Sequence, residues 1–233
     1  MKNAPLFLLG LFVALVISFG GIVLGSHAQL GRLTAYFDDA EGQTYPQRLS
    51  GVGARGQQVY AELGCAACHT QQVRRPDFGS DHARGWGDRQ SVARDYVHEA
   101  RPQLGAARIG PDLANLARRQ PTTDSLNRLL YFGSATHPSY KFLFDERKVI
   151  GEPSASRLEI SGGAVPAGYE IVPTERGQTL VSYLLSLNQT YTYPESKHVA
   201  PAPKAAAAPV KHDEKASPAA ASDQKKKEGA QAK

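Results

Sequence analysis

Both cysteines of this 233-residue chain lie in one pentapeptide, "CAACH", at residues 65–69. Two thiols three residues apart can add to the two vinyl groups of one porphyrin, and the adjacent histidine is then carried beneath the iron. The spacing therefore predicts one covalently attached haem c. Cys65 and Cys68 would hold the macrocycle, and His69 would be an iron ligand.

Two other uses of a Cys-x-x-Cys pair fit the sequence less well. A thioredoxin-like redox pair should close a strand and open a helix, but this motif comes after a helical pattern with no alternating strand pattern around it. A structural zinc site needs four ligands, and the chain has only two sulfurs in cysteine. An exported pair of free thiols would also be exposed to oxidation to a disulfide. The haem interpretation is therefore preferred.

The N-terminus reads "APLFLLGLFVALVISFGGIVLG" from Ala4 to Gly25, without a charged residue. At about 1.5 Å of rise per residue, such a helix covers the hydrocarbon core of a bilayer, which is about 30 Å thick. A cleaved signal peptide is the alternative, since "SHA" at 26–28 offers small residues, but signal h-regions have only about 7 to 15 residues. We expect a retained anchor over residues 1–28. Both interpretations export the C-terminal remainder of the chain, so we expect the haem domain on the outer side of the membrane.

Composition divides the remaining chain into three segments. Residues 29–53 are polar and Gly-rich, as in a juxtamembrane linker, and residues 54–192 carry the helical patterns and the CAACH motif of one domain. Residues 193–233 are rich in Ala, Pro and Lys and have too little to bury to offset the entropy of ordering, so we expect a disordered tail. The net charge of +5 arises largely from residues 201–233, which carry seven lysines against four acids. No aromatic residue lies there to stack on bases, which argues against nucleic-acid binding.

Hydrophobic periodicity predicts an all-α fold, with a helical domain after the anchor. Four segments show helical spacing, and one segment rich in Gly and Pro reads as a loop or a short hairpin. The helices are expected over 55–63, 89–100, 121–132 and 174–191, and the loop or hairpin over 149–173. The first helix should end at Gly64 and the third before Gly133, because glycine commonly stands just past a helix C-terminus.

A second motif, "IGPDLANLARR", begins at Ile109. An iron-bound imidazole needs its second nitrogen held by an acceptor that fixes the ring. Proline has a carbonyl but no N–H, which makes Pro111 the candidate for that acceptor. The alternative is a simple turn before a helix.

The order of these elements resembles a known family. A helix, then "CAACH", "GPDL" and a C-terminal "LVSYLLSL" resembles the class I cytochrome c fold. The anchor with a Gly pair near its end, "GCAACHTQQVR" and "WGDRQSVARDYVHEARPQLGAARIGPDLANL" resemble more specifically the membrane-anchored mono-haem subunit II, of the FixO type, of cbb-type haem–copper oxidases. The resemblance covers roughly residues 5–190. It implies a class I cytochrome c domain with one haem c.

The resemblance also implies the sixth iron ligand. Family members carry a sequence like "MPSYPWLF" at this ligand, and this chain reads "HPSYKFLF" from His137, so the resemblance assigns the position to His137. The residues themselves leave alternatives open. Met1 is the only methionine and lies across the membrane from the haem, while His82 or His98, or an open position on the iron, remain possible. An imidazole in place of a thioether favours ferric iron and lowers the reduction potential.

The leading functional hypothesis is a non-catalytic electron-transfer subunit. The resemblance implies that the haem accepts an electron from a soluble cytochrome c or a partner subunit and passes it toward the catalytic subunit of a haem–copper oxidase, among other membrane subunits. No nucleophile, base and orienting group stand together in the sequence. The alternatives are an anchored cytochrome of another respiratory complex, and a haem-based sensor or peroxidase-like protein with a labile sixth ligand.

Overall fold

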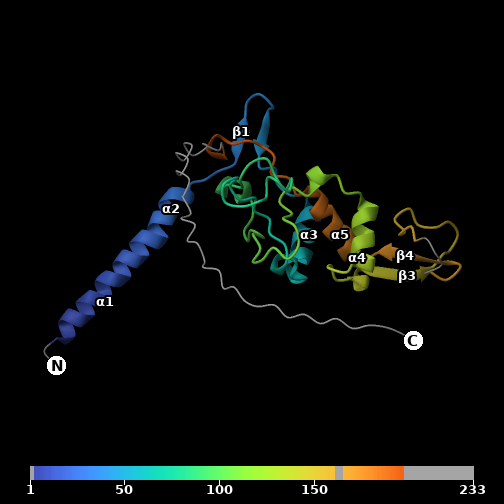
Figure 1. The fold of residues 1–233 in the computed structure, drawn as a ribbon, viewed down its shortest axis with the longest axis horizontal. Coiled ribbons are helices and arrows are strands. Elements are labelled where there is room, and N and C mark those ends of the chain that lie inside the picture. Colours follow the sequence, from blue (N-terminus) through green and yellow to red (C-terminus); the bar gives the residue numbers. More distant parts are fainter. Residues whose placement is uncertain (1–2, 161–164, 197–233) are drawn as a thin grey trace, which may run out of the picture. The chain divides into compact units, whose positions relative to one another are not determined.

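The computed structural model describes residues 3–160 and 165–196 (Figure 1). The predicted tail, 193–233, therefore lies outside the described residues except for 193–196. Tyr193 and Ser196 are each 1% exposed, and a 3₁₀ turn covers Pro194–Ser196. The packed part of the chain thus continues to Ser196.

An apolar helix occupies the N-terminus from Ala4 to Leu30. It consists of α1 (Ala4–Ser18), a π-helical turn (Phe19–Leu24) and α2 (Gly25–Leu30). Its most apolar 18-residue window has a mean hydropathy of 2.7, and none of that window is buried in the protein. The helix is therefore long and apolar enough to cross a membrane once, as predicted for the anchor.

The predicted juxtamembrane linker contains a β-hairpin. Strand β1 (Tyr36–Asp38) pairs antiparallel with β2 (Gln43–Tyr45). The ring of Tyr45 stacks on that of Tyr191 with centroids 4.0 Å apart, and the Tyr191 hydroxyl donates to the Asp38 carboxylate at 2.6 Å. The hairpin is therefore attached to the C-terminal end of the domain by aromatic and polar contacts.

Three of the four predicted helices are confirmed. They are α3 (Gly51–Glu62), α4 (Thr123–Phe132) and α5 (Glu175–Ser186). The residue before each helix, Ser50, Thr122 or Thr174, accepts a hydrogen bond from a backbone N–H of the first turn through its side chain. The Ser50 cap explains why α3 begins before the predicted residue 55.

The core forms where these three helices meet (Figure 1). Helices α3 and α5 pack closely because Gly56 has no side chain: a Cβ there would overlap the Thr179 carbonyl and the Tyr183 side chain. The buried residues include Val59, Tyr60, Leu113, Leu126, Leu130, Leu143, Phe144, Ile171, Leu180, Val181, Tyr183 and Leu184. The core therefore draws on α3, α4, α5 and the loops between them.

The prediction of an all-α fold holds only in part, because the domain also contains a second two-stranded sheet. Strand β3 (Phe144–Lys148) pairs antiparallel with β4 (Tyr169–Pro173). The polar run of β3 shows no strand alternation, and its pairing is stabilised instead by tertiary contacts. Ile171 is buried in the core, and the Arg147 guanidinium donates to the Glu170 carboxylate at 2.9 Å. The expected loop or short hairpin over 149–173 therefore connects and partly forms this sheet.

The prediction of a helix over 89–100 is wrong. Only the 3₁₀ turn Ala93–Tyr96 forms there. The Asp95 carboxylate accepts the backbone N–H of Val92 at 2.8 Å and binds the buried Arg89 guanidinium at 2.6 Å. In a longer helix the Asp95 carboxylate would face solvent. Here it binds the backbone and a buried guanidinium instead, and these bonds hold the segment in a short turn.

Candidate functional site

The cysteine motif begins directly after α3. Gly64 takes a left-handed φ of +70°, which reverses the chain, and Cys65–Ala67 form a 3₁₀ turn. Within this turn the His69 N–H donates to the Cys65 carbonyl at 3.0 Å. Both cysteines are free thiols in the structure, and burial raises the pKa of Cys65 to about 11. The helix stop predicted at Gly64 thus leads directly into the motif.

The two cysteines and His69 line a cavity of about 400 Å³. Its walls come from α3, the segment 109–119, α4, the loop 134–140 and α5. They are largely apolar, with Leu113, Leu116, Leu126, Leu129, Leu130, Leu180 and Leu184. A concave, mostly apolar cavity with a few polar groups is typical of a cofactor site.

The His69 ring is held by Pro111, as the sequence predicts. The Nδ1 atom lies 2.8 Å from the Pro111 carbonyl oxygen, which can only accept, so Nδ1 carries the proton. In the neutral form of the imidazole, the other ring nitrogen carries no proton and can bind a metal. Gly110 lies against the ring, and a Cβ at this position would overlap it. The segment 109–111 is therefore shaped around the imidazole.

His137 lies in the same cavity. The ring centroids of His69 and His137 are 6.2 Å apart, with the planes inclined at 50°. Two imidazoles that bind one metal ion from opposite sides have centroids roughly 6 Å apart, because each metal–nitrogen bond is about 2 Å long. Burial lowers the pKa of His137, and His69 adds to this effect, so the neutral imidazole is favoured. The spacing of the two imidazole rings and the neutral state of His137 both suit the binding of one metal ion.

A short turn carries His137. Gly133 has a φ of +68°, and the Ser134 hydroxyl oxygen accepts the His137 N–H at 3.1 Å. The Ser134 N–H in turn donates to the His137 carbonyl at 2.8 Å. These bonds join residues close in sequence, so the turn is held mainly by contacts within itself.

The cavity therefore brings together Cys65, Cys68, His69, Pro111 and His137. The other histidine candidates are elsewhere. His98 does not line this cavity. His82 lines a different one, and its Nε2 lies 3.1 Å from the Arg74 carbonyl.

Two polar groups in the cavity were missed by sequence reasoning. The Tyr60 hydroxyl is buried and has no hydrogen-bond partner within residues 3–160 and 165–196. Arg119 lines the same cavity, where burial lowers its pKa, and its guanidinium donates to the Asp112 carbonyl. Arg119 is the last residue of the "IGPDLANLARR" motif, so the motif could have indicated that it lies near the site. Tyr60 reads only as one apolar residue on the face of a helix.

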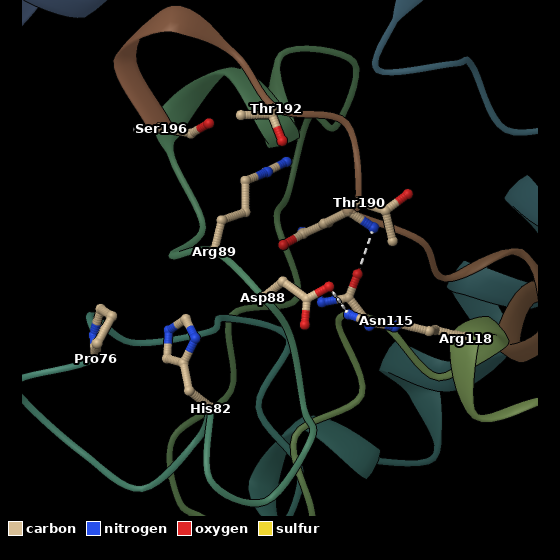
Figure 2. A pocket seen from close by; sticks show the side chains of 10 residues that line it. Pro76, His82, Asp88, Arg89, Asn115, Arg118, Thr190, Thr192 and Ser196 are labelled. Atoms are coloured by element: carbon tan, nitrogen blue, oxygen red, sulfur yellow. Dashed lines mark hydrogen bonds and ion pairs between the residues drawn. The ribbon is translucent and has the colours of Figure 1, made fainter. Parts of the chain in front are cut away.

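A second cavity, of about 250 Å³, lies around Asp88, Asn115 and Arg118 (Figure 2). Its polar groups bind one another. Asp88 pairs with Arg118, and the Asn115 side chain accepts from the Gln189 N–H at 2.8 Å and donates to the Trp86 carbonyl at 3.0 Å. These bonds join the loop 86–89 to the chain after α5, which indicates a structural role.

Comparison with known families shows which family the chain belongs to. A model of the family described as cytochrome c oxidase, mono-heme subunit/FixO matches residues 2–169. The chain belongs to the FixO family. It is therefore a mono-haem subunit of a cytochrome c oxidase, and the resemblance drawn from the motifs is confirmed. No curated protein matches the chain. The family match ends within β4, so α5 lies outside it although this helix supplies part of the cavity wall.

Proposed function

We propose that this FixO subunit binds one haem c in the cavity and relays electrons within a cbb-type oxidase complex. Cys65 and Cys68 would hold the haem through two thioether bonds, and His69 and His137 would bind its iron. The observation that carries the proposal is the 6.2 Å separation of the two imidazole rings in a cavity that both cysteines line.

The residues present fit a haem. The leucine-rich walls suit the faces of a porphyrin. The His69 ring lies so close to Gly110 that no side chain would fit at position 110. The polar ends of the macrocycle need donors, and the cavity offers the Tyr60 hydroxyl, which has no partner among the described residues, and the Arg119 guanidinium. When bound, haem supplies a one-electron couple at the iron. No group in the protein needs to act on a substrate for this function.

The protein contributes orientation and a route to the surface. Pro111 fixes which nitrogen of His69 carries the proton, and burial keeps His137 neutral. Two apolar residues that line the cavity are solvent-exposed, with exposed fractions of 77% for Ile109 and 39% for Leu129. They bring one edge of the cavity near the surface, where a donor or acceptor protein can approach.

The anchor and the family together support a place in the oxidase complex. A single apolar helix before a haem domain would fix the electron carrier beside the catalytic subunit, on the periplasmic side of a bacterial inner membrane. A soluble cytochrome c or another subunit of the complex would donate the electron. The imidazole in place of a methionine gives this carrier a lower potential than a methionine-ligated haem would have.

Visible and low-temperature EPR spectra of the purified ferric protein test the proposal. We expect a low-spin spectrum without the charge-transfer band that a methionine ligand gives at the red end of the visible range. A high-spin spectrum would remove His137 from the iron and favour the labile-ligand alternative. Copurification with a subunit that carries haem b and copper tests the assignment to the oxidase complex.

A further inference from the structure

Hydrogen bonds join two segments on either side of the His69–Pro111 contact. The segments are residues 68–72 and residues 110–114, and we call this pair the His69 ladder. The Gly110 N–H donates to the Cys68 carbonyl at 3.0 Å on one side of the contact. The Leu113 N–H donates to the Thr70 carbonyl at 2.7 Å on the other. The ladder therefore fixes the backbone that carries both the ligand and its acceptor.

Asp112 stands at the centre of the ladder, directly after Pro111, and is 0% exposed. One oxygen of its carboxylate accepts the Thr70 hydroxyl at 2.6 Å and the Gln72 N–H at 2.8 Å. The other oxygen accepts the Ala114 N–H at 2.9 Å. The Asp112 side chain thus binds both segments. Asp112 directly follows Pro111, and its partner Thr70 directly follows His69.

The negative charge of Asp112 is only partly compensated. Two cations lie near it: the Nη2 atom of Arg108 is 3.7 Å from the carboxylate, and the Arg119 guanidinium donates to the main-chain carbonyl of Asp112 rather than to its carboxylate. The Arg108 guanidinium donates to the Asp81 carboxylate and to the Gln72 carbonyl, both at 2.5 Å. Arg108 is therefore shared, and a buried anion remains beside the acceptor of His69. Buried charges are weakly screened by salt.

We propose that Asp112 is a positioning residue for the iron ligand, and that its buried charge biases the haem toward the ferric state. The carboxylate holds the Pro111 carbonyl against His69 Nδ1, and that hydrogen bond makes the imidazole a stronger donor to iron. A unit charge at roughly 10 Å, at an effective permittivity of about 20, changes the oxidation equilibrium by roughly tenfold. The inference rests on the proposed function, in which His69 binds the haem iron.

Asp112→Asn keeps the size of the side chain and removes its charge. We expect the equilibrium to shift toward ferrous haem by about tenfold, which is a rise of about 59 mV for a one-electron couple. Potentiometric titration of the full-length, haem-loaded protein measures this shift. Asp112→Glu, which restores the charge, should return the potential toward the wild-type value.

Asp95→Asn is the matched control. Asp95 is also a buried carboxylate, it is paired with Arg89, and it does not line the haem cavity. A purely structural role for Asp112 predicts that both substitutions lower the melting temperature and that neither moves the potential. We expect the melting temperature to fall for both and the potential to move for Asp112→Asn alone.

Thr70→Val removes a hydrogen bond to Asp112 but keeps the charge of its carboxylate, so it tests whether Asp112 positions His69. This variant tests the inference even if Asp112→Asn does not fold. Loss of the hydroxyl donor should loosen the ladder and split the low-spin EPR signal into two or more His69 orientations, and Thr70→Ser should restore one signal. An unchanged potential in Asp112→Asn with haem attached, or an unsplit signal in Thr70→Val, overturns the inference. Wild-type protein without covalent haem would instead overturn the proposed function.

Discussion

The two sides of the cavity are built differently. On the His69 side, residues 68–72 and 108–114, the imidazole proposed as a ligand is held across 42 positions of the sequence by Pro111, and the buried Asp112 binds both segments. On the His137 side, residues 133–140, the second proposed ligand sits in a turn closed largely by local bonds to Ser134. A local turn can change its ligand without disturbing distant contacts. This difference predicts that the side chain at position 137 can be exchanged more easily than the residues of the His69 side.

Removal of both thiols breaks the His69 side most completely. Cys65→Ala with Cys68→Ala leaves no sulfur to bond the porphyrin, because the chain has no other cysteine. We expect all covalently held haem to be lost, as measured by haem staining on a denaturing gel. The His137→Ala variant is the control and should retain the stain. Staining of the double variant would mean that haem attachment does not use these cysteines.

The His137 side should accept an exchange of ligand. His137→Met places a thioether at this position, and a thioether favours ferrous iron more than imidazole does. We expect the potential to rise by more than about 59 mV, a tenfold change for one electron. Potentiometric titration measures it, and a potential that does not move would show that His137 is not the ligand.

Gly110→Ala sharpens the comparison by changing the space behind His69. A Cβ there overlaps the ring, so we expect a loss of about 1–3 kcal/mol in stability, together with a displaced imidazole. Gly51→Ala is the control, because no atom lies within 4 Å of the Cβ that it adds. Chemical unfolding of both variants measures the difference. Equal stability for the two would contradict the close packing of Gly110 on the ligand.

Ser134→Ala should weaken only the His137 side. The hydroxyl accepts the His137 N–H, and loss of such a bond costs about 0.5–1.5 kcal/mol. We expect faster binding of carbon monoxide to the reduced haem, because His137 leaves the iron more readily, and little change in the hydrogen bond of His69. Flash photolysis measures the rebinding rate. A rate equal to that of the wild type would mean that the turn does not hold the ligand.

Acid should weaken the His69 side through Asp81. Burial opposes ionisation of Asp81, but hydrogen bonds from Arg74 and Arg108 outweigh it and hold the pKa of this carboxyl below its ordinary value of 3.8. A lowered pKa gives stability that is fully present above about pH 4 and is lost as the pH falls below it. Urea unfolding between pH 3 and pH 6 should show this loss, and Asp81→Asn should reduce it. A pH dependence identical to that of the wild type would exclude Asp81 as its source.

The sequence predicted the residues whose chemistry is tied to spacing or to a local cap. The Cys65–His69 motif has one spacing that suits a porphyrin, and Thr122 and Thr174 begin their helices with side-chain caps. The His69–Pro111 contact could be predicted from the need of an iron-bound imidazole for an acceptor.

The rest depends on contacts between distant segments. The predicted helix over 89–100 failed because Asp95 binds Arg89 and Val92 instead of solvent. Strands β3 and β4 carry no alternating pattern that would mark them. Asp112 reads as one acid in a turn, and its role becomes visible only when Thr70 lies beside it. Tertiary pairing decides such elements, and one sequence does not display it.

The most direct test of the account is the low-temperature EPR spectrum of the ferric, full-length protein. Iron held between His69 and His137 should give a wholly low-spin spectrum that becomes high-spin, or takes up an external ligand, when His137 is replaced by Ala. A high-spin spectrum of the unaltered protein, or a low-spin spectrum that survives His137→Ala unchanged, would contradict the pairing of the two imidazoles across the cavity.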